Sequence, residues 1–146
     1  MTTNYEYYKS SAMQWNIIFK HDNEWMKKHG YPIAVYTRFM INGKITNYII
    51  VSNNFFKLSS KTQQFVYCHE VGHHLQHIHD THSSFNSIEL ECDADNYARM
   101  RVGGSKYAII ALQELQEAAT KLRCFEAVKE LQSRIDYIQH SKGMVK

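Results

Sequence analysis

The sequence has neither a long apolar run nor a large excess of charge. Its longest apolar stretches, such as residues 48–51, are far too short for a transmembrane helix. Residues 1–6 lack the charged and then apolar pattern of a signal peptide. The 17 basic and 14 acidic residues give a net charge of only +3, without a basic run. We therefore expect a protein that binds neither membranes nor nucleic acid.

Cysteine is also scarce in this sequence. There are three cysteines, an odd number, and their spacing matches no disulfide framework. Disulfides are rare in reducing compartments, so this usage predicts a cytoplasmic protein. The remaining composition, with 44% apolar and 21% charged residues in 146, is that of a globular chain with a real core. We expect residues 1–146 to form a single domain.

The first part of the chain predicts one helix followed by a β-hairpin. Apolar residues keep roughly helical spacing over residues 5–29, and Gly30 is a stop signal. Residues 33–41 and 44–52 are rich in β-branched and aromatic side chains. Asn42-Gly43 between them is a strong signal for a tight turn that joins two antiparallel strands.

The remainder of the chain predicts helices. Ser60 with Gln63, and Asn86 with Glu89, match the spacing of capping boxes at helix starts. Residues 80–84 are typical of a loop. The helices are predicted at 61–79, 86–102, 105–120 and 123–140. The fold class expected is α+β: a mostly helical domain with a small antiparallel β-hairpin or sheet before the first of these helices, and a C-terminal helical hairpin at about 105–140.

Residues 69–73 read H-E-x-x-H, the most informative motif of the chain. On a helix, residues four apart lie on one face, so His69 and His73 can each direct a ring nitrogen at one Zn²⁺. Glu70 then lies beside the open side of the metal, where a general base is needed. Six of the nine histidines fall between residues 69 and 82, a density that suits a metal site.

A catalytic zinc site usually has three protein ligands, and the next helix offers the third. Residues 91–95 read E-x-x-A-D. Glu91 and Asp95 are one turn apart on one face. Glu91 is expected to bind the metal, and Asp95 to accept the outer N–H of His69 or His73 and so fix its tautomer. The small Ala94 lets this helix approach the H-E-x-x-H helix closely. Glu91 comes eighteen residues after His73, which leaves room for a loop, so we expect the second helix to run antiparallel to the first.

Two alternatives to Glu91 remain open in the sequence. Asp93 is about 200° around the helix from Glu91, so only one of the two can face the metal. His79 matches the spacing of a third metzincin histidine, but that motif needs a glycine where this chain has Gln76. A continuous helix would also place His79 about 15 Å along the axis from His69. Glu91 is favoured because a same-face aspartate follows it one turn later.

In these two motifs the chain resembles the gluzincin metallopeptidases. It is similar to the compact ImmA/IrrE-like peptidases and to the catalytic core of HtpX and CAAX-protease relatives, over about residues 45–110. The resemblance implies a zincin-like fold and a zinc ion with Glu91 as its third ligand. HtpX-type proteins carry transmembrane helices, none of which is expected here, and ImmA/IrrE-like proteins usually have Asn at the place of Asp95. The resemblance therefore indicates the chemistry and not a particular substrate.

The expected function is zinc-dependent hydrolysis of peptide bonds in a protein substrate. Zinc held by His69, His73 and Glu91 would activate water and polarise the carbonyl, and Glu70 would transfer the proton to the leaving amine. The alternative is a non-catalytic or latent zinc-binding module that interacts with another, regulatory protein. Glu70 argues against a purely structural site, which has no use for a base.

Overall fold

The computed structural model describes residues 2–80 and 86–141 of the chain. The chain forms two compact units, Met1–Leu58 and Ser59–Lys146. A small sheet precedes the helix that carries H-E-x-x-H, and helices make up most of the rest, so the predicted helical α+β fold is confirmed. The single domain expected for residues 1–146 remains a prediction. Within the described residues, no helix is both long and apolar enough to cross a membrane.

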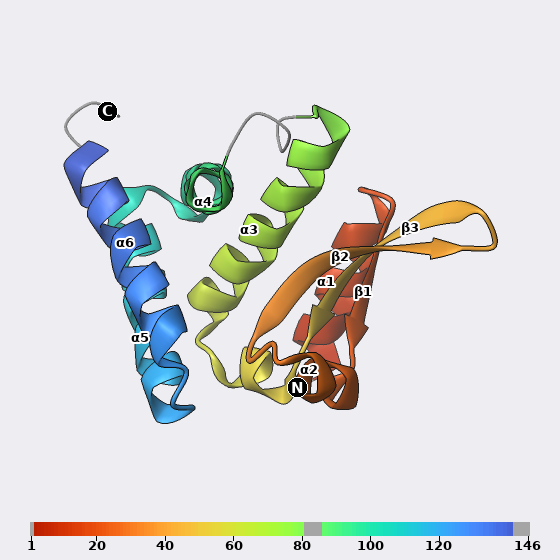
Figure 1. Cartoon of the computed structure of the whole chain (residues 1–146), viewed down its shortest axis with the longest axis horizontal. Coiled ribbons are helices and arrows are strands. Elements are labelled where there is room, and N and C mark those ends of the chain that lie inside the picture. Colours follow the sequence, from red (N-terminus) through yellow and green to blue (C-terminus); the bar gives the residue numbers. More distant parts are fainter. Residues whose placement is uncertain (1, 81–85, 142–146) are drawn as a thin grey trace. The chain divides into compact units, whose positions relative to one another are not determined.

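The first unit is built on a three-stranded sheet (Figure 1). The predicted turn is present: Asn42 and Gly43 have φ angles of 51° and 77°, as a two-residue type I′ turn requires. The predicted hairpin is therefore confirmed. A further strand pairs in parallel with its second strand, which makes the sheet mixed. The strands are β1 (Ile17–His21), β2 (Ala34–Ile41) and β3 (Lys44–Val51), in the order β1-β3-β2.

The single helix predicted at residues 5–29 is wrong. Two helices occupy its ends and strand β1 occupies its middle: α1 (Thr2–Met13) and α2 (Asn23–His29). Asn16, with a φ of 60°, ends the helical path of the backbone. Strand β1 then alternates buried Ile17 and Phe19 with the exposed Ile18. This alternation of period two is that of a half-buried strand, and it overrides the approximate helical spacing.

An aromatic cluster forms the core of the first unit. The rings of Tyr8 from α1 and Phe19 from β1 lie 5.4 Å apart between centroids. Phe55, from the short 3₁₀ helix η1 (Asn53–Lys57), lies 5.5 Å from Tyr8 and 5.9 Å from Phe19. All three rings are buried, so their contacts fix the helix against the sheet.

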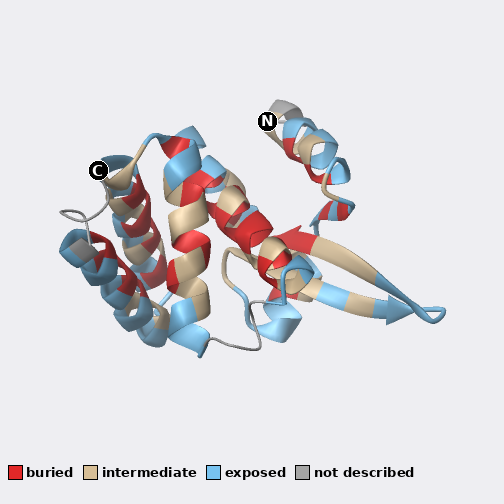
Figure 2. Ribbon diagram, turned by 90° about the horizontal axis from the view of Figure 1, so that it is seen from above, coloured by how far each residue is buried: buried red, intermediate tan, exposed pale blue. Residues whose placement is uncertain are grey.

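The described residues of the second unit form four helices, whose bounds differ from the predicted ones by at most two residues (Figure 1). Buried residues form stripes along all four, facing the neighbouring helices (Figure 2). The C-terminal helical hairpin is present, because α5 and α6 lie side by side. The helices are α3 (Ser60–Ile78), α4 (Ser87–Val102), α5 (Ser105–Lys121) and α6 (Phe125–Ser141).

Helix α3 begins one residue earlier than the predicted capping box. Ser59, and not Ser60, is the N-cap, and its hydroxyl oxygen accepts a hydrogen bond from the backbone N–H of Thr62. Glu114 on α5 accepts hydrogen bonds from the Ser59 N–H and hydroxyl, both at 2.8 Å, and from the Thr62 hydroxyl. A carboxylate thus lies at the electropositive start of α3.

Helix α4 has the ends that its sequence predicts. Asn86 and Glu89 form the expected capping box, with each side chain accepting a hydrogen bond from the other residue's backbone N–H. Gly103 ends the helix with a φ of 108°. The loop predicted at residues 80–84 falls, from residue 81 onward, outside the described residues.

Helices α3 and α4 approach each other very closely. The contact is at Gly72 and Ala94, where a Cβ atom added to the glycine would lie 3.1 Å from the Cα atom of Ala94. The expectation that Ala94 permits a close approach is therefore confirmed. The helices cross, however, and do not run antiparallel: Figure 1 shows α4 end-on while α3 runs through the view. Small residues at the crossing point allow backbones to meet at such an angle.

Candidate metal centre

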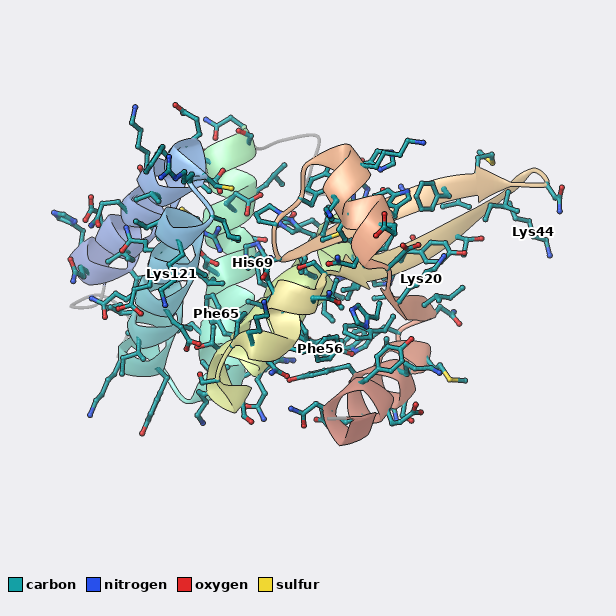
Figure 3. All side chains as sticks on the ribbon, turned by 90° about the horizontal axis from the view of Figure 1, so that it is seen from below. Lys20, Lys44, Phe56, Phe65, His69 and Lys121 are labelled. Atoms are coloured by element: carbon teal, nitrogen blue, oxygen red, sulfur yellow. The ribbon has the colours of Figure 1, made fainter. Side chains whose placement is uncertain are left out.

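Helix α3 brings the two histidines of H-E-x-x-H together on one face. His69 and His73 are one turn apart, and their Nε2 atoms lie 3.1 Å from each other. The ring of His69 projects from α3 toward α4 (Figure 3). His69 is buried and His73 is partly exposed, so one side of the pair remains open. Helical periodicity alone therefore predicted this pair correctly.

Glu91 on α4 completes a group of three potential ligands. Its Oε1 lies 3.0 Å from Nε2 of His69, and its Oε2 lies 3.4 Å from Nε2 of His73. Among the described residues, these three side chains are the one group of His, Cys, Asp and Glu whose donor atoms converge, all within 4.8 Å of one another. Tetrahedral zinc with bonds of about 2.0–2.1 Å separates its ligand atoms by about 3.3 Å. The donor atoms are thus close enough together to bind one metal ion of this size.

The outer nitrogen of His69 is held by Asp95. The Nδ1 atom of His69 lies 2.8 Å from Oδ1 of Asp95, whose side chain is fully buried. A carboxylate accepts hydrogen bonds only, so Nδ1 carries the proton. This arrangement leaves Nε2, on the side of Glu91, as the ring nitrogen that can bind a metal ion once its own proton is displaced. The structure therefore places Asp95 where the sequence analysis expected it.

The outer nitrogen of His73 is held by Gln76. The sequence analysis considered this residue only because it stands where a metzincin motif needs glycine. Nδ1 of His73 lies 2.9 Å from Oε1 of Gln76. The amide of Gln76 donates to the Leu90 carbonyl at 2.8 Å and to Oδ2 of Asp93 at 3.0 Å. These bonds orient the buried glutamine so that its oxygen faces His73. The signal in the sequence was its position three residues after His73, on the same helix face.

The two alternative ligands lie outside the converging group. Asp93 contacts Gln76 and so acts on the metal centre only through that amide and His73. His79 is the C-cap residue of α3 and is exposed. Neither belongs to the group formed by the three converging side chains.

Arg134 is the second residue that the sequence analysis missed. It comes from α6, and only 7% of it is exposed. Its Nε donates to Oδ2 of Asp95 and its Nη2 to Oδ1, both at 2.8 Å. Its Nη1 lies 3.8 Å from Oε1 of Glu91. The available signal was a charged residue within the apolar stripe of α6, formed by Leu131, Ile135 and Ile138.

Glu70 is a buried carboxylate with no partner among the described residues. It is 8% exposed, and no hydrogen bond or ion pair joins it to any part of the chain that the structure describes. Buried polar groups in folded proteins are nearly always paired, with protein or with ordered water. An unpaired carboxylate directly after His69 is therefore a candidate for chemistry and not for stability.

The charges around His69 are strongly coupled. Burial and the Arg134 guanidinium lower the pKa of His69. The carboxylates of Asp95 and Glu91 raise it by more, so the pKa is about 10, above its usual range. Burial raises the pKa of Glu91, whereas hydrogen bonds from both imidazoles hold it below its usual range. Burial likewise raises the pKa of Asp95, and Arg134 and His69 lower it by more. Both carboxylates are thus ionised at neutral pH, and a metal ion that binds His69 displaces a proton.

The cysteines beside the group supply no ligand to it. Cys68 and Cys92, the neighbours of His69 and Glu91, are both free. Burial raises the pKa of each thiol to about 11. Metals bind the thiolate form, which is scarce at neutral pH for such a thiol.

Comparisons with protein families, with curated proteins and with solved structures found no match to this chain. The resemblance to gluzincins thus rests on the two motifs of the sequence alone.

Proposed function

We propose that this protein is a zinc-dependent metallopeptidase of gluzincin type. The observation that carries the proposal is the convergence of His69, His73 and Glu91, with donor atoms 3.0–3.4 Å apart in neighbouring pairs. Two imidazoles and one carboxylate form a donor set that suits zinc. Three protein ligands, unlike the four of a structural zinc site, leave one position open for water or substrate.

The residues around the group have separate roles in this proposal. When bound, zinc supplies a Lewis acid and lowers the pKa of its water toward about 7. Glu70, unpaired and buried beside His69, is the general base that accepts a proton and passes it to the leaving amine. Asp95 and Gln76 fix the ring orientation of the two histidines. A protein or peptide is the substrate class.

The test compares the wild type with Glu70→Gln. Zinc content is measured on both proteins, and both are incubated with a peptide library made by digesting a cell proteome. We expect equal zinc, about one ion per chain, and new cleavage products with the wild type only. Glu117→Gln is the matched control, because it makes the same chemical change at an exposed site on α5 and should leave cleavage intact.

Two outcomes would contradict the proposal. A wild type without bound zinc would refute the metal centre itself. Zinc in both proteins with identical peptide profiles would refute the peptidase and favour a non-catalytic zinc-binding module, for which Glu70 is dispensable.

A further inference from the structure

Arg134 is a buried cation directly behind the metal group. Leu131, Ile135 and Ile138 around it on α6 are apolar and buried, and the half-exposed Glu130, one turn earlier, lies 3.6 Å from its Nη1. A guanidinium in such a setting needs carboxylate partners. It has one at hydrogen-bond distance, Asp95, which it contacts through two nitrogens at 2.8 Å.

The paired contact fixes the plane of the Asp95 carboxylate. Oδ2 accepts from Nε of Arg134, while Oδ1 accepts both from Nη2 of Arg134 and from Nδ1 of His69. Two parallel N–H···O bonds resist rotation of a carboxylate far better than one bond does. The direction in which Oδ1 faces the imidazole is thus determined from α6, a helix that contributes no member of the ligand group.

We propose that Arg134 is a positioning residue of the metal centre: through Asp95 it holds His69 in the orientation that binds zinc. The inference rests on the metal site of the proposed function, but it requires zinc binding only and not peptide hydrolysis. Arg134 would thereby make the centre depend on the C-terminal helix α6 as well as on α3 and α4.

The charge of Arg134 and its geometry act in opposite directions on zinc affinity. A positive charge near the site repels a cation, so its removal alone would favour zinc. The loss of the paired hydrogen bonds would instead release Asp95 and His69 and weaken binding. Arg134→Lys separates the two effects, because lysine keeps the charge but presents a point donor in place of the planar fork.

The experiment measures the zinc dissociation constant by competition with a chelator. We expect Arg134→Lys to weaken zinc binding by about 10- to 100-fold, the usual effect of losing an outer-shell partner. Arg123→Lys is the matched control, since it makes the same change at an exposed residue and should stay near the wild-type value. The visible absorption spectrum of the cobalt-substituted protein, which reports ligand geometry, should change in Arg134→Lys only. Wild-type affinity and an unchanged spectrum in Arg134→Lys would overturn the inference.

A double-mutant cycle tests whether Arg134 acts through Asp95. The background is Asp95→Asn, which replaces the carboxylate that accepts both hydrogen bonds of Arg134, and the second change is Arg134→Lys, which keeps the positive charge. If Arg134 works through Asp95, this second change should alter zinc affinity by less than about threefold relative to Asp95→Asn alone. A further loss of about tenfold would show a direct effect and refute the positioning role.

The failure of this inference can be told apart from failure of the proposed function. A wild type that binds zinc but cleaves no peptide refutes the peptidase, while the dissociation constants of the Arg134 variants still decide the positioning role. A wild type that binds no zinc refutes both.

Discussion

Gly72 of α3 and Ala94 of α4 meet so closely that a Cβ atom on the glycine would lie 3.1 Å from Cα and 3.2 Å from Cβ of the alanine. Each residue belongs to one of the two motifs of the metal centre, between the histidines on α3 and after Glu91 on α4. Gly72, at an x position of H-E-x-x-H, and Ala94, the alanine of E-x-x-A-D, are thus not neutral spacers here. They set the distance between the helix that carries His69 and His73 and the helix that carries Glu91.

Gly72→Ala should therefore destabilise the protein, although alanine is the better helix former. The gain in helix propensity is about 1 kcal/mol, whereas overpacking of a close contact costs about 1–3 kcal/mol. We expect a net loss of about 1 kcal/mol in the free energy of unfolding in urea, together with weaker zinc binding. Ser133→Ala on the exposed face of α6 is the control, because it raises helix propensity without a close helix contact and removes only an exposed hydrogen bond to the Lys129 carbonyl. A more stable Gly72→Ala protein would show that the two helices can separate without cost.

The ligand assignment predicts an order of effects in alanine variants. His69→Ala, His73→Ala and Glu91→Ala should each remove most of the zinc, because each deletes a donor atom. Asp93→Ala should weaken zinc by less, since it reaches His73 only through Gln76. The exposed His79→Ala should have no effect.

Zinc dissociation constants and zinc content after dialysis measure this order. Major loss of zinc in His79→Ala would replace the present assignment with the metzincin-like one. If Asp93→Ala lost as much zinc as Glu91→Ala, the assignment of Glu91 over Asp93 as the third ligand would be overturned.

Local signals predicted much of the fold. The turn at Asn42 and Gly43 and the capping box of Asn86 and Glu89 are each determined by residues close together in sequence, and both are present in the structure. Strand β1 was missed for the opposite reason. Ile18 and Phe19 fit a helical spacing with the residues before them, and only pairing with β3, far along the chain, makes their segment a strand.

The same distinction applies to the metal centre. His69 and His73 follow from the helix period, and Glu91 from a second local motif. Arg134 is 65 residues from His69, and their contact depends on how α6 packs against α3 and α4. Helical periodicity could identify a charge on an apolar face, but it could not tell which carboxylate neutralises that charge.

Gln76 offers a test of His73, whose Nδ1 faces an amide oxygen, whereas Nδ1 of His69 faces a carboxylate. Gln76→Leu keeps the side-chain volume and removes the oxygen that accepts from Nδ1 of His73. We expect zinc affinity to fall by about 10- to 100-fold, because no group then fixes the tautomer and the orientation of the His73 ring. Gln113→Leu, at an exposed position of α5, is the control. Unchanged affinity in Gln76→Leu would show that helix α3 alone orients His73.

Glu114 should make the stability of the second unit sensitive to acid. Burial raises the pKa of Glu114, but hydrogen bonds from Thr62 and from the N–H and hydroxyl of Ser59 lower it by more, so its net pKa is below normal. In the unfolded chain the pKa of a glutamate carboxyl is about 4.3. The contribution of Glu114 is then fully present above that pH, and it is lost as the pH falls through the lower pKa of the folded state.

The variant Glu114→Gln tests this dependence. At pH 7 it should be less stable than the wild type by about 1 kcal/mol, the value of a carboxylate at a helix start. The difference should shrink as the pH is lowered from 5 to 3, because the wild-type carboxyl becomes neutral as well. Urea unfolding of both proteins across this range measures the effect, with Glu117→Gln as the exposed control on the same helix. A difference that stays constant with pH would mean that Glu114 supports the start of α3 through hydrogen bonds alone and not through its charge.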